Sequence, residues 1–246
     1  MATLDAAARR LVESERLADL EAATARLIQT ARSMVESDLS TRSLCEGWTR
    51  GHVLSHVSRN ADGATRLLWW GRTGVPWFQY RSQTLRDQEI DDGAGRTLEE
   101  QVTDLEESAA RVLAEGRELA AEDWERPIRW LSGNEQPARS VLAARLAEVE
   151  YHHVDLDAGY SFADWPSNYL ARQVELIARR LTPRTATDFE VLAEDVDVRA
   201  AVGAGVPEQT VAGSAADLVG WLSGRSRGSR LSVTPSGPLP SPPPYG

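Results

Sequence analysis

The sequence predicts a mainly α-helical protein, in which an antiparallel four-helix bundle over residues 1–161 is followed by a small α+β domain over residues 162–236. Three observations predict this organisation. Apolar residues recur at helical spacing in four segments before residue 160, and strand-like alternation begins only near residue 188. The composition, with 41% hydrophobic and 26% charged residues, is that of a folded globular chain.

The first two helices are predicted from apolar spacing and from a capping residue. Residues 4–35 carry Leu20 and Leu27 among apolar positions at helical spacing, which predicts the first helix. A loop follows, and Thr49 is predicted to cap a second helix over about residues 51–70.

The next segments predict a long connection and two further helices. Residues 71–95 are rich in Gly, Arg and aromatic residues and are expected to be irregular. Thr97 and Glu100 form a capping box that predicts a third helix, which ends near residue 120. A fourth helix is predicted over about residues 140–158, and four helices joined up and down form an antiparallel bundle.

The second domain mixes predicted helices and strands, and the chain ends in a Pro-rich tail. The expected elements are a helix over about 167–181, strand-like segments over 188–202 and 208–213, a short helix capped by Ser214 and ending at Leu222, a strand over Arg230–Thr234, and a polyproline-type tail over 237–246.

Charge and composition exclude several classes of protein. A net charge of −10 argues against a nucleic-acid partner, which requires a basic surface. No apolar run is long enough to span a bilayer, and the charged N-terminus lacks a signal peptide, so we expect a cytoplasmic protein without a membrane partner. Cys45 is the only cysteine, which excludes an internal disulfide or a multi-cysteine metal site.

The predicted fourth helix carries the side chains best suited to chemistry. Glu148 and His152 are four residues apart, so they lie one turn apart on one face and can bind a single metal ion. A histidine from another helix would complete a three-ligand site with an open position, as catalytic zinc prefers. A second polar stripe contains Glu150 and His153, and spacing alone leaves open which stripe faces the interior and whether either is merely solvated.

Three segments resemble one known family. They are LCEGWTRGHVLSHVSRNADG (44–63), RLAEVEYHHVDLDAGY (145–160) and GSAADLVGWLSGRSRG (213–228). In this order and spacing they resemble the motifs of the mycothiol-dependent maleylpyruvate isomerases, which belong to the DinB-like metal-binding four-helix bundles. The resemblance implies a DinB-like N-terminal bundle and covers nearly the whole chain.

The resemblance assigns roles to individual residues. It implies that His52, Glu148 and His152 bind a divalent metal, usually zinc, and that Arg225 is needed for activity. His56 matches a motif position but is not expected to be a ligand.

Three further residues have two readings each, and a fourth has one. Asp155 is a candidate to orient His152 or to pair with an arginine, and Arg81 and Arg86 are either carboxylate-binding groups or solvated loop charges. Cys45 is expected to pack in the core.

The resemblance also implies the reaction. A metal-bound thiolate of mycothiol adds to the cis double bond of maleylpyruvate, the resulting single bond rotates, and elimination gives fumarylpyruvate; this belongs to gentisate-type aromatic degradation. One alternative is a metal-dependent thiol S-transferase acting on another electrophile, and a second is a non-catalytic metal-binding module. The expected partners are a small-molecule substrate and a low-molecular-weight thiol, with the protein a monomer or weak homo-oligomer.

Overall fold

The computed structural model describes residues 6–242, which form two compact units divided between Gly159 and Tyr160. The first unit is a helical bundle and the second is a small α+β unit, so the predicted fold class is confirmed. No described helix is long and apolar enough to cross a membrane. Residues 243–246 of the predicted Pro-rich tail lie outside the described residues, and residues 237–242 have no regular secondary structure.

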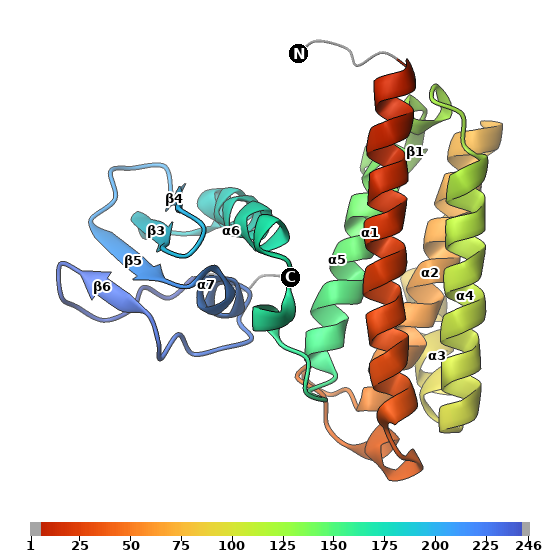
Figure 1. Ribbon diagram of the computed structural model, residues 1–246, viewed down its shortest axis with the longest axis horizontal. Helices are drawn as coiled ribbons and strands as arrows, with labels where there is room; N and C mark the ends of the chain where they lie inside the picture. Colours follow the sequence, from red (N-terminus) through yellow and green to blue (C-terminus); the bar gives the residue numbers. More distant parts are fainter. Residues whose placement is uncertain (1–5, 243–246) are drawn as a thin grey trace. The chain divides into compact units, whose positions relative to one another are not determined.

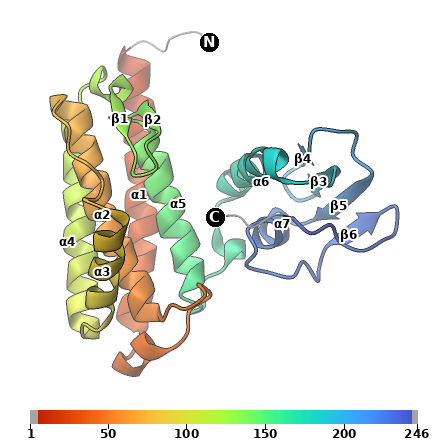
Figure 2. The ribbon, with the colours of Figure 1, turned by 180° about the vertical axis from the view of Figure 1, so that it is seen from behind.

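Four long helices form the bundle of the first unit (Figures 1 and 2). Its elements are α1 (Ala6–Ser33), α2 (Arg50–Thr73), α3 (Gln83–Ala94), α4 (Leu98–Glu118), α5 (Ser140–Asp155) and a hairpin of β1 (Pro127–Arg129) and β2 (Glu135–Pro137). Helix α1 contacts α4 and α5, and α2 contacts the same two helices. Their apolar faces share one core, in which Leu20, Leu54 and Leu142 are buried.

The predicted caps fix where two bundle helices begin. Thr49 Oγ1 accepts a hydrogen bond from the His52 backbone N–H at 3.4 Å, at the start of α2. Thr97 Oγ1 accepts from the Glu100 backbone N–H at 3.3 Å, and the Glu100 carboxylate accepts from the Thr97 backbone N–H at 2.8 Å. Both caps satisfy N–H groups that have no partner within the helix.

The expectation that residues 71–95 are irregular is wrong, because this segment contains α3. The helix begins after Ser82, whose hydroxyl accepts from the Leu85 backbone N–H at 3.1 Å. Only Ile90 and Gly93 of α3 are buried, so the helix lacks the apolar stripe on which a prediction from periodicity depends. Gly93 lets α3 approach α2, since a Cβ at this position would lie 2.2 Å from Ser55 Oγ.

The second unit is a four-stranded sheet with two helices. Its elements are α6 (Ser167–Leu181), β3 (Phe189–Ala193), β4 (Val198–Val202), β5 (Gln209–Gly213), α7 (Ala215–Leu222) and β6 (Ser232–Thr234). The strand order is β4-β3-β5-β6, in which β3 pairs parallel to β5 and the other pairs are antiparallel. Both helices contact the sheet and each other. Ser214 caps α7 as predicted, accepting from the Asp217 backbone N–H at 3.1 Å.

Candidate metal centre

Helices α2 and α5 bring three potential metal ligands together in the bundle. His56 comes from α2, and Glu148 and His152 come from successive turns of α5. Glu148 Oε2 lies 2.8 Å from His56 Nε2 and 3.5 Å from His152 Nε2, and the three donor atoms all lie within 4.8 Å of one another. We call these residues the His–Glu–His cluster.

The structure brings together Glu148 and His152 as predicted, but it does not place His52 with them. His52 lies one turn before His56, and its Nδ1 contacts the Thr49 hydroxyl at 2.8 Å as part of the cap of α2. Its Nε2 lies 3.8 Å from Asp91 Oδ1 on α3. The geometry therefore favours His56, which the sequence motif contained but which was not expected to be a ligand.

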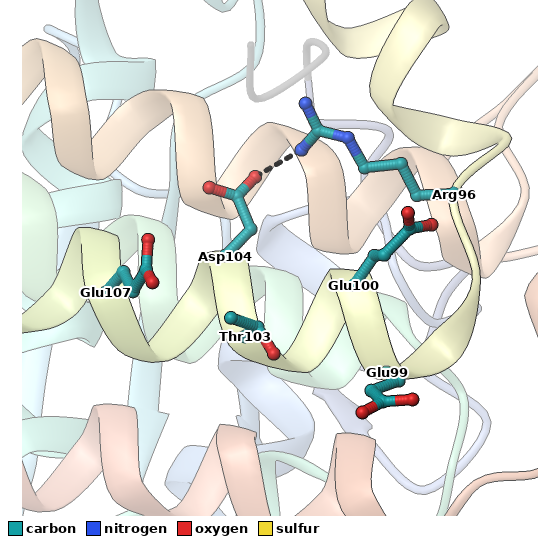
Figure 3. A pocket seen from close by; sticks show the side chains of 6 residues that line it. All are labelled: Arg96, Glu99, Glu100, Thr103, Asp104 and Glu107. Carbon is teal, nitrogen blue, oxygen red and sulfur yellow. Dashed lines mark hydrogen bonds and ion pairs between the residues drawn. The ribbon is translucent and has the colours of Figure 1, made fainter.

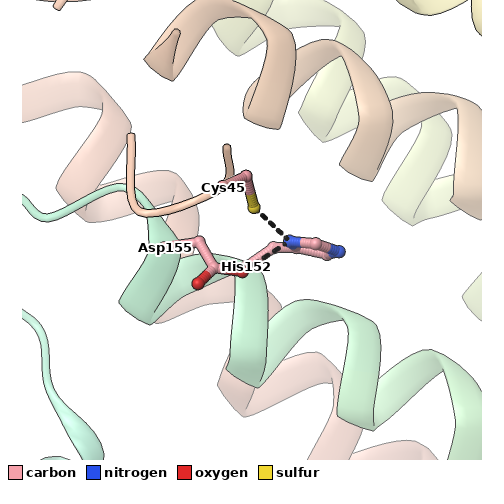
Figure 4. Close-up of side chains that lie close together, drawn as sticks. All are labelled: Cys45, His152 and Asp155. Atoms are coloured by element: carbon pink, nitrogen blue, oxygen red, sulfur yellow. Dashed lines mark hydrogen bonds and ion pairs between the residues drawn. The ribbon is translucent and has the colours of Figure 1, made fainter. Parts of the chain in front are cut away.

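Asp155 and Cys45 contact the far side of the His152 ring (Figure 4). Asp155, which is 1% exposed, accepts from His152 Nδ1 at 2.9 Å. This contact supports the predicted orienting role of Asp155, because a proton held on Nδ1 leaves the Nε2 lone pair directed at the cluster. Cys45 Sγ lies 3.9 Å from the same nitrogen, so the thiol packs against the core and also borders the site.

An arginine from α3 contacts the second nitrogen of His56. Arg86 Nη2 lies 3.1 Å from His56 Nδ1, and Arg86 Nη1 lies 2.7 Å from Asp87 Oδ1. Because a guanidinium has no acceptor, His56 Nδ1 must accept this bond, and the ring proton is on Nε2, from which it donates to Glu148. Sequence analysis treated Arg86 as a loop residue, since α3 was not recognised.

Trp48 packs over the histidines from the loop before α2. Its ring centroid lies 5.3 Å from that of His56 and 6.4 Å from that of His152. The His56 and His152 rings are themselves 4.5 Å apart and almost perpendicular. An apolar ring in this position limits access of water to the two imidazoles.

Burial and hydrogen bonds shift the pKa values of the three residues of the cluster. Burial and the charge on His152 lower the pKa of His56 to about 4. Burial raises the pKa of the Glu148 carboxyl, but hydrogen bonds with His152 and His56 outweigh burial and lower this pKa well below its usual value. Burial lowers the pKa of His152, yet its contacts with Asp155 and Glu148 raise it well above 6.5.

The donor set fits a divalent transition metal. Two imidazole nitrogens and one carboxylate oxygen are ligands of catalytic zinc sites that keep a fourth position open. The Glu148 side chain is 36% exposed, whereas those of His56 and His152 are 4% and 16% exposed, so the cluster is reached from solvent beside Glu148. A histidine ligand coordinates as the neutral imidazole, and Asp155 beside Nδ1 favours the form of His152 that offers Nε2.

Arg225 belongs to the second unit, in the turn after α7. Its backbone N–H donates to the Gly220 carbonyl at 2.8 Å, and its guanidinium contacts the Ser223 carbonyl at 3.4 Å. Its role toward the cluster therefore stays a prediction that comes from the sequence motif. Arg81, the other loop arginine considered, is exposed.

A pocket of about 360 Å³ lies on α4, but its lining does not define a reactive site (Figure 3). Its lining residues are Arg96, Glu99, Glu100, Thr103, Asp104 and Glu107. Arg96 is already paired with Asp104 at 2.5 Å, and the remaining groups are acidic or hydroxyl-bearing residues of one helix face.

Fold and site together define the class of this protein: it is a helical-bundle protein in which two antiparallel helices carry a candidate metal centre of two histidines and one glutamate. The comparisons with known proteins give the family. Residues 20–157, more than half of the chain, match the family described as "Mycothiol maleylpyruvate isomerase N-terminal domain". The chain belongs to this family.

Two solved structures extend the similarity to both units. One is a crystal structure of a mycothiol-dependent maleylpyruvate isomerase, which is 29% identical, with a TM-score of 0.88. The other, a histidine-to-alanine variant of an enzyme of the same name, is 28% identical, also with a TM-score of 0.88. Each comparison covers 95% of this chain and 97% of the other. No curated protein matches the sequence significantly.

Proposed function

We propose that this protein is a mycothiol-dependent isomerase that converts maleylpyruvate into fumarylpyruvate, with a divalent metal, zinc, held by His56, Glu148 and His152. The His–Glu–His cluster is the observation that carries the proposal, since it supplies three ligands in a bundle of the matching family. The similarity of both units to solved enzymes of that name supports the substrate.

The reaction needs a nucleophile that adds and then leaves. A thiol has an ordinary pKa near about 8.5, and bound zinc would lower it so that the cofactor reacts as a thiolate at neutral pH. When bound, mycothiol would supply a thiolate that adds to the conjugated double bond of the substrate and later leaves, so that the bond is single and can rotate between these two events.

The protein's own residues hold and shield the reacting groups. Asp155 keeps the His152 ring oriented, and Trp48 covers both imidazoles. Cys45 is not required as the nucleophile, because the cofactor brings its own thiol. Arg225 is proposed to stabilise the enolate or to bind a substrate carboxylate, since a guanidinium forms strong paired hydrogen bonds to such oxygens.

The test is the absorbance change of maleylpyruvate with purified zinc-loaded protein, with and without mycothiol. We expect conversion to fumarylpyruvate only when both protein and thiol are present, and loss of conversion after chelation. Arg225→Ala is expected to reduce turnover without changing zinc content. Absence of conversion by protein that binds zinc stoichiometrically would reject the proposed reaction, and unchanged activity of the Arg225→Ala variant would reject its proposed role.

A further inference from the structure

Arg145 is a buried cation next to the His–Glu–His cluster, and it has no carboxylate partner. It is 2% exposed, and its Nη1 donates to the Val57 carbonyl at 2.8 Å and to Asn60 Oδ1 at 2.9 Å. Within residues 6–242 its buried Nε makes no hydrogen bond and its guanidinium forms no ion pair. A buried charge is unfavourable unless it is paired, so this position is suited to an anion that comes from outside the chain.

Tyr80 adds a second buried polar group beside Arg145. Its ring lies against α2 at Gly63, where a Cβ would be 3.3 Å from Tyr80 Cζ, the carbon that carries the hydroxyl. Gly63 follows Asn60 by about one turn, so the hydroxyl end of Tyr80 lies near the contact between Asn60 and Arg145. The residue is 6% exposed; its hydroxyl meets no partner at hydrogen-bond geometry among the described residues, and the Arg86 guanidinium is the charged group that acts on it most strongly.

Arg86 covers this pair of groups from the solvent side. Its guanidinium carbon lies 5.8 Å from the centroid of the Tyr80 ring, and its Nη2 contacts His56 of the cluster. The Arg86 side chain is 19% exposed and that of Glu148 is 36% exposed, whereas Arg145 and Tyr80 are buried. Arg86 is therefore the more accessible of the two guanidinium groups.

We propose that Arg145, Tyr80 and Arg86 form a carboxylate-binding subsite that holds one carboxylate of the substrate beside the His–Glu–His cluster. Two guanidinium groups, which can only donate hydrogen bonds, and one hydroxyl that can donate as well match the two acceptor oxygens of a carboxylate. Glu148, the nearest acidic group that acts on the Arg145 charge, is committed to the cluster. The subsite positions the adjacent double bond, and it rests on the proposed function for the identity of the substrate.

The experiment measures binding of maleate, a stable cis dicarboxylate, to zinc-loaded protein by calorimetry or by fluorescence of the tryptophans. Tyr80→Phe removes only the hydroxyl, which meets no partner at hydrogen-bond geometry among the described residues, so the free energy of unfolding in urea is expected to be unchanged or slightly higher. Maleate affinity is expected to fall about tenfold, as for loss of one hydrogen bond to a charged group. Arg145→Met and Arg86→Met are expected to lower it by about tenfold or more at equal zinc content.

Arg117→Met is the matched control, because Arg117 already pairs with Glu21 at 2.7 Å on the surface of α4. Its maleate affinity should equal that of the unchanged protein. Equal maleate affinity in Tyr80→Phe and the unchanged protein would overturn the subsite, and this variant decides the matter even where Arg145→Met fails to fold. Weaker maleate binding in a protein that does not isomerise maleylpyruvate would keep the subsite and reject only the proposed reaction. If Tyr80→Phe isomerises maleylpyruvate with an unchanged KM, the proposed reaction is kept and the subsite is rejected.

Discussion

The choice between His56 and His52 as the third metal ligand can be decided by one pair of variants. The two histidines lie one turn apart on α2, and only His56 places a ring nitrogen in the His–Glu–His cluster. Replacing each by glutamine removes an imidazole from the same helix while keeping a polar side chain. We expect His56→Gln to abolish tight zinc binding and His52→Gln to retain it.

The expected magnitudes follow from the contacts of each ring. Substitution of a residue that only orients a ligand costs about 10–100-fold in metal affinity, so loss of a ligand itself should exceed about 100-fold, or about 2.7 kcal/mol. His52 contacts Thr49 at the helix cap and lies 3.8 Å from an exposed Asp91 carboxylate. Its replacement should cost about 1 kcal/mol or less of helix stability and change zinc affinity less than about threefold.

Zinc affinity is measured by competition with a chromogenic chelator, and urea unfolding of the metal-free variants serves as the control for folding. Similar losses in both variants, or a larger loss in His52→Gln, would refute the assignment of His56. Such a result would show that α2 and α5 have a different axial offset when the metal is bound.

Three further predictions test the surroundings of the cluster. Asp155→Asn should weaken zinc binding by about 10–100-fold in the same competition assay, because His152 loses its carboxylate acceptor. As the pH falls from 6.5 to about 4, the free energy of unfolding of metal-free protein should decrease by up to about 3 kcal/mol. The reason is that His56 stays neutral in the folded state, whereas the same side chain takes up a proton in the unfolded chain. Urea titrations measure this decrease, and it should be missing in His56→Gln. Gly63→Ala should lower unfolding free energy by about 1 kcal/mol, since its Cβ would lie 2.9 Å from Gln79 Cγ, and an unchanged urea midpoint would contradict this.

The contacts of His56 connect the metal centre with the proposed carboxylate subsite. Arg86 donates to His56 Nδ1, and the Nε2 proton is directed at Glu148. A metal ion and this proton cannot share Nε2, and a neutral imidazole that coordinates through Nε2 carries its proton on Nδ1. Nδ1 then ceases to be an acceptor for Arg86. Metal binding should therefore free one N–H group of the Arg86 guanidinium for the proposed carboxylate subsite.

Those parts of the fold that depend on local sequence were predictable. Thr49, Thr97 and Ser214 marked the starts of helices because capping uses residues within one turn of each other. Helix α3 was not predicted because only two of its residues, Ile90 and Gly93, are buried, so its sequence shows no apolar stripe. Its position depends on packing against α2, which is distant information that local sequence does not contain. Periodicity predicts a helix only where a wide apolar face is buried.

The proposed metal ligands show the limit of the same reasoning. Glu148 and His152 were predictable together because their relative position is set by the pitch of a single helix. The third ligand depends on the axial offset between α2 and α5, which no spacing within α2 encodes, since His52 and His56 lie on the same face of that helix. That offset is fixed by contacts between the helices: Arg145 of α5 reaches the Val57 carbonyl and Asn60 of α2, which places Glu148, one turn further along α5, opposite His56. The buried arginine that we assign to the carboxylate subsite is thus also one of the contacts that place His56 opposite Glu148.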